Sequence, residues 1–135
     1  MTRGSARERG QALVELAVCL PVLLALALGC SALARLADAR AGLDAATAEA
    51  AAVAARAPDP ESALALANSR FAAVVARYPL SGAEVGLDLG GFGRGVQVHA
   101  TGRAEVDLSW ALPPIPDHLW IGATAAALVQ PWRSR

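Results

Sequence analysis

The chain has 135 residues, with 12 basic and 12 acidic side chains, so its formal net charge at pH 7 is zero. This balance excludes binding to nucleic acid or to an anionic membrane through bulk charge. Hydrophobic residues make up 55% of the chain but aromatic residues only 4%, so small side chains supply most of the apolar content. Outside one very apolar segment, roughly 100 residues remain, which is enough for one modest domain and too few for a multidomain enzyme.

The apolar segment near the amino terminus is long enough to cross a membrane. Residues 16–34 carry no charge, and starting at Ala12 gives about 23 positions, interrupted only by Glu15. A helix of that length reaches ~34 Å, against about 30 Å for a hydrocarbon layer. Arginines dominate the charges before the segment, which predicts a cytoplasmic amino terminus, a single membrane pass and an extracytoplasmic remainder.

Three fates are compatible with this segment. Residues 32–34 read A-L-A, where signal peptidase could cut and release a soluble domain. Residues 26–30 read L-A-L-G-C, similar to a lipobox that would attach lipid to Cys30. Either fate would make the protein an exported or lipid-anchored binding domain whose amino-terminal segment is only a signal peptide. The third fate is a retained helix, either in a polymerising subunit or in a plain membrane anchor.

Glu15 favours the retained helix. An acidic residue near the middle of a membrane helix costs about 2.5–3.5 kcal/mol, and less near the interface, so the carboxylate needs a partner. Cleavage between Gly10 and Gln11 would create an ammonium group four residues before Glu15, on the same helix face. This ammonium, on the same or a neighbouring subunit, would pair with the carboxylate and set the axial register between subunits.

The motif at residues 7–16, R-E-R-G-Q-A-L-V-E-L, resembles the processing site of type IV prepilins. More narrowly, residues 9–21 resemble the TadE-like family, the minor pilins or pseudopilins of the tight-adherence (Flp) pilus. The resemblance implies cleavage after Gly10 by a prepilin peptidase, with Glu15 as the fifth mature residue and a subunit-docking group. Leu16 stands where major Flp pilins usually have Tyr, and about 100 residues follow the helix; both features favour a minor component.

The resemblance also implies what the protein binds. The expected partners are the prepilin peptidase, other pilin or pseudopilin subunits, the pilus assembly machinery and membrane lipid, without nucleic acid. The expected organisation is a leader (1–10), a transmembrane pilin-like helix (11–34) in which Pro21 favours a bend, and an extracytoplasmic head (35–135). The role is structural rather than enzymatic.

No motif for catalysis or for cofactor or metal binding is recognisable in the sequence. Cys19 and Cys30 lie ~16 Å apart on one helix, which excludes a disulfide between them within one chain. His99 and His118 have no Cys or carboxylate at ligand spacing and are expected on the surface. The glycine-rich residues 90–95 lack the Lys-Ser or Lys-Thr of a phosphate-binding loop and join two alternating segments, so we expect a turn.

The pattern of apolar residues after the membrane segment predicts an α+β head. The first helix continues to about residue 57 with a seven-residue apolar stripe, formed by Leu36, Ala39, Leu43, Ala46, Ala50, Val53 and Ala57, while polar residues including Thr47 lie off the stripe. A second helix is expected at 59–78, capped by Asp59 and Pro60, with a buried face of Leu64, Ala67, Phe71, Val74, Val75 and Tyr78.

Alternating apolar residues after position 83 predict a small antiparallel sheet of about three strands between residues 83 and 130. The middle segment is expected to bend at Gly102 and to keep its apolar parity through Trp110. The prolines at 113, 114 and 116 predict a stiff connection. Residues 120–130 are ambiguous by pattern, and the TadE-like resemblance implies that they form a final strand.

Overall fold

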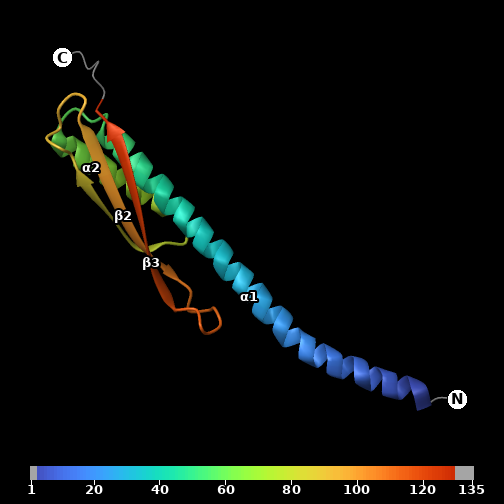
Figure 1. Cartoon of the computed structure of the whole chain (residues 1–135). Helices are drawn as coiled ribbons and strands as arrows, with labels where there is room; N and C mark the ends of the chain where they lie inside the picture. Colours follow the sequence, from blue (N-terminus) through green and yellow to red (C-terminus); the bar gives the residue numbers. More distant parts are fainter. Residues whose placement is uncertain (1–2, 130–135) are drawn as a thin grey trace.

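The computed structural model describes residues 3–129, with side chains from residue 11 onward except at position 12. It contains two helices, α1 (Arg3–Ala54) and α2 (Pro60–Val75), and three strands, β1 (Ser81–Asp88), β2 (Gln97–Asp107) and β3 (His118–Leu128). Figure 1 shows α1 running the length of the molecule, with the other elements gathered along its carboxy-terminal half. The predicted α+β class, with a long apolar first helix, is confirmed.

Both helices end about one turn earlier than the sequence pattern predicts. α1 ends at Ala54 rather than near residue 57, and α2 at Val75 rather than at Tyr78. In each case the last residues form a tighter turn, with backbone bonds to the third residue back, such as Tyr78 N–H to the Val75 carbonyl. The predicted cap of α2 is confirmed, because Asp59 accepts the Ser62 backbone N–H at 2.8 Å.

The three strands form one antiparallel sheet in the order β1-β2-β3. The glycine-rich residues 90–95 make the turn between β1 and β2, as expected, with positive φ at Gly90, Gly91 and Gly95. β2 pairs with β3 without a register shift from Gln97 to Asp107, so the strand is continuous where a bend was expected. β3 confirms the predicted final strand, whose expected end at Gln130 lies outside the described residues.

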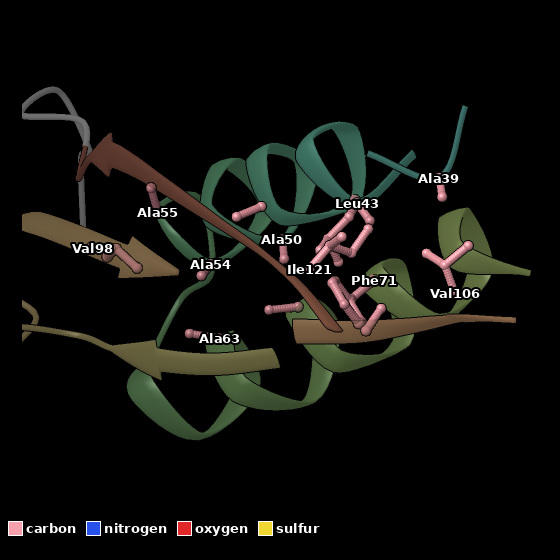
Figure 2. Close-up of a cluster of buried hydrophobic side chains, with 14 of the residues drawn as sticks. Ala39, Leu43, Ala50, Ala54, Ala55, Ala63, Phe71, Val98, Val106 and Ile121 are labelled. Carbon is pink, nitrogen blue, oxygen red and sulfur yellow. The ribbon is translucent and has the colours of Figure 1, made fainter. Parts of the chain in front are cut away.

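One face of the sheet packs against the helices, and the other is open. The α1 stripe lies in the core, where its residues 39, 43, 46, 50 and 57 are buried and Leu36 and Val53 are half-buried. From the sheet, Val98, Val106 and Ile121 contribute, and Figure 2 shows these side chains with Leu43 and Phe71 between the helices and the strands. The small α1 residues allow close approach of helix and sheet.

Thr47 is the main exception to the predicted core. It was expected off the stripe, yet it is fully buried, and its hydroxyl donates to the Leu43 carbonyl at 2.7 Å. A Cβ on Gly102 would lie 2.3 Å from Thr47 Oγ1. The glycine in β2 therefore allows helix and strand to touch, rather than marking a bend.

Two other burial predictions are wrong. Leu64 is 42% exposed, and Ala63 takes its place in the core beside Ala67 and Phe71. Trp110 does not continue the inward parity of β2, because the strand ends at Asp107 and Trp110 lies in the following loop. Val74, Val75 and Tyr78 are half-buried.

Candidate functional site: the apolar half of α1

The amino-terminal half of α1 has almost no contact with the rest of the chain. Every leucine and valine from residue 13 to residue 26 is exposed. Within the described residues, one helix, Leu13–Ala54, is long and apolar enough to cross a membrane. A surface of this kind, apolar all round, is stable only in lipid or against other apolar helices.

The predicted processing motif lies inside this helix. Gly10 and Gln11 have helical backbones within α1, and Glu15 follows Gln11 by four residues. The helix therefore places Gln11 and Glu15 one turn apart on one face, as the spacing requires, and both side chains are exposed. Cleavage after Gly10 and pairing of Glu15 with a new ammonium group stay predictions.

Pro21 and the two cysteines also lie on this helix. α1 continues on both sides of Pro21, and its amino-terminal part changes direction (Figure 1); the assignment of that bend to Pro21 stays a prediction. Cys19 and Cys30 are free and exposed. Lipid attachment to Cys30, which belongs to the lipoprotein alternative, is likewise a prediction.

A polar cluster, consisting of Arg35, Glu105, Asp107, Ser109 and His118, lies where the head begins along α1. The Ser109 backbone N–H donates to Asp107 at 2.9 Å and, with the Ser109 hydroxyl and the positive charges of His118 and Arg35, lowers the pKa of Asp107. His118 Nδ1 lies 3.0 Å from Glu105 Oε1. Arg35 Nε is buried without a hydrogen-bond partner. The sequence analysis missed this cluster, because the pairing of β2 with β3 brings His118 beside Asp107 and Glu105, and the packing of α1 on the sheet brings Arg35 near Asp107.

The open face of the sheet carries both short side chains, such as Thr101 and Thr124, and long ones, such as Arg103 and Trp120, with shallow hollows between them. One hollow is lined by Arg103, Trp120, Ile121 and Gly122, and others lie above Thr101. His99 is exposed on this face, as its parity predicted. Across residues 3–129, no three His, Cys, Asp or Glu side chains are grouped to hold a metal ion.

Comparison with known proteins finds a similarity over the helical segment. Residues 10–52 match the family model described as TadE-like protein. The match begins at the glycine of the predicted processing site and ends near the end of α1. Comparisons with curated proteins and with solved structures find no match. Residues 10–52 are therefore similar to the TadE-like family, which is pilus-associated and structural, as the amino-terminal motif indicated.

Proposed function

We propose that this protein is a minor pilin or pseudopilin that takes part in assembling a tight-adherence (Flp) pilus or a related secretion system. The observation that carries the proposal is the apolar half of α1, which is exposed on all sides and lies in the TadE-like segment. A monomer leaves that surface uncovered. Membrane lipid would cover it before assembly and neighbouring pilin helices afterwards.

In this proposal the amino terminus is cytoplasmic and the head extracytoplasmic. A prepilin peptidase cuts after Gly10, and the assembly machinery draws the processed helix out of the membrane. Glu15 then pairs with the ammonium group of Gln11 on its own or a neighbouring subunit. The carboxylate and the ammonium group can pair at only one axial offset between two adjacent apolar helices. The pair would therefore set the axial position of the incoming subunit.

The head has a separate role in this proposal. Its sheet packs on the second half of α1 and leaves the first half free, so the same helix can join a bundle while the head remains folded. The open face of the sheet combines polar side chains with the exposed Trp120 and Leu128, which suits a surface that faces water or partner subunits.

The test replaces Glu15 by Gln in the producing bacterium and measures both membrane insertion and piliation. We expect unchanged insertion, since the amide is easier to insert than the carboxylate, and a loss of pili or of subunit incorporation. Glu49→Gln is the matched control, because it makes the same chemical change on the same helix, where Glu49 pairs with Arg70 in the head. Normal piliation with Glu15→Gln would remove the docking role.

A second experiment tests processing. Replacing Gly10 by Val should block the cut after residue 10, so the protein would keep its leader and run as the longer form on intact-mass analysis. Cys30→Ser should change the mass of the processed chain only by the mass difference between cysteine and serine. Loss of a lipid mass in the Cys30 variant would favour the lipoprotein alternative instead.

A further inference from the structure

The loop between β2 and β3 has an unusual composition for a surface connection. Residues 108–116 contain no charged side chain and three prolines. Trp110 is 38% exposed and Leu112 is 46% exposed, so two large apolar side chains face outward from one short loop. Its base is closed by the Leu108 N–H, which donates to the Asp117 carbonyl at 2.7 Å.

This loop lies at the end of the sheet that faces the amino-terminal half of α1 (Figure 1). At this end of the head, Arg35 of α1 acts electrostatically on Asp107, the last residue of β2. Ala111 and Ile115 pack against the buried cluster that includes Ala32, which is 4% exposed. The head therefore reaches along α1 into the uncharged segment that ends at residue 34.

The length of the uncovered helix fixes the depth of the loop. The apolar run begins at Ala12, side chains 13–27 are exposed, and burial begins at Leu28. From Ala12 to Ala27 the helix is about 24 Å long at ~1.5 Å per residue, shorter than the about 30 Å of a hydrocarbon layer. When α1 spans a bilayer, its next turns, and the loop beside them, must lie at the depth of the outer leaflet.

We propose that residues 108–116 form a membrane-contacting loop, with Trp110 and Leu112 seated in the outer interfacial layer of the bilayer that α1 crosses. Tryptophan favours this layer because its ring is apolar while its indole N–H needs a polar partner. The inference rests on the membrane-spanning part of the proposed function, not on piliation.

The backbone and the flanking charges suit the same depth. Prolines have no N–H, so three of the donors that the loop would otherwise expose to lipid are absent. The acidic residues at the base, Glu105, Asp107 and Asp117, must remain in water, which stops the head from sinking further. The loop would hold the head at a fixed height and orientation on the membrane until α1 is extracted.

The test measures the depth of Trp110 in the full chain, reconstituted at one molecule per lipid nanodisc. Trp120 and Trp132 are replaced by Phe, so that Trp110 is the single reporter. We expect its fluorescence to be quenched by lipids brominated near the headgroup end of the acyl chains, and less by lipids brominated near the chain ends. Leu112→Trp, in a background with all three tryptophans replaced, is a second reporter and should behave in the same way.

The matched control is Leu128→Trp in the background without other tryptophans. Leu128 is 59% exposed but lies ten residues along β3 from His118, about 33 Å away, and should not be quenched. Absence of quenching at both loop positions would overturn the inference, as would equal quenching at position 128. Acrylamide, a quencher in the aqueous phase, gives a further check. If Trp110 were protected from acrylamide only when several copies share a nanodisc, the loop would contact a second copy of the chain instead of lipid. Quenching with normal piliation of Glu15→Gln would keep this inference and remove the docking role of Glu15.

Discussion

Replacing Gly102 by Ala should destabilise the head, because the helix and the sheet touch at this glycine. The added Cβ would lie 2.3 Å from Thr47 Oγ1, 3.1 Å from Leu43 Cδ1 and 3.4 Å from Phe71 Cε2. Thr47 cannot easily retreat, since it is fully buried and its hydroxyl is bonded to the Leu43 carbonyl. Overpacking of this kind costs about 1–3 kcal/mol, against ~0.5–1 kcal/mol gained by replacing glycine within a strand. The difference is a net loss between 0 and about 2.5 kcal/mol, and because three buried side chains would be crowded at once, we expect the upper half of that range.

The assay is urea unfolding of the full chain in detergent micelles, followed by tryptophan fluorescence. Gly122→Ala is the matched control, because the nearest atom to its added Cβ is the Gly102 carbonyl oxygen at 3.8 Å, on the open face of the sheet. It should be neutral or slightly stabilising. Adding Thr47→Ala should relieve the clash, with a coupling free energy of about 1 kcal/mol or more. If Gly102→Ala is as stable as Gly122→Ala, the close contact is not real.

Three further predictions concern the head and use the same unfolding assay. Leu43→Ala should cost about 2–5 kcal/mol, because Leu43 is fully buried, whereas Leu64→Ala should stay within about 0.5 kcal/mol; similar losses would contradict the burial pattern. Asp59→Ala should cost about 0.5–2 kcal/mol through loss of the α2 cap, and an unchanged midpoint would show that the cap is unimportant. The pKa of Asp107 is lowered from 3.8, chiefly by the Ser109 N–H, so its stabilisation is complete above pH 3.8 and is lost as the pH falls through the lower folded-state pKa. Asp107→Asn should therefore flatten this part of the acid-side stability curve, and a curve identical to that of the wild type would argue against the Ser109 contact.

The sequence predicted those parts of the fold that depend on local periodicity. The seven-residue stripe identified the buried face of α1, and alternation identified the strands. The burial of Thr47 could not be predicted, because its hydroxyl donates a hydrogen bond to a carbonyl of its own helix and a hydropathy pattern does not show such bonds. Gly102 could be interpreted only after Thr47 was known to lie against it.

In the candidate site too, the local features could be predicted from the sequence and the features that depend on tertiary packing could not. The spacing of Gly10, Gln11 and Glu15 is local, so the motif could be identified in the sequence, and the family match begins within it. The contact between His118 and Glu105 depends on the register of β2 against β3. The position of the 108–116 loop beside the apolar segment depends on how far the head extends along α1, which composition alone does not determine.

The account depends most on the state of the amino terminus in the native membrane. Intact-mass analysis with amino-terminal sequencing of the protein, purified from membranes of the producing cell, tests it directly. We predict a mature chain that begins at Gln11 and retains the whole apolar helix. A chain that begins at Arg35, or at a lipid-modified Cys30, would contradict the pilin-like assignment, because the helix that must join a filament would then have been removed.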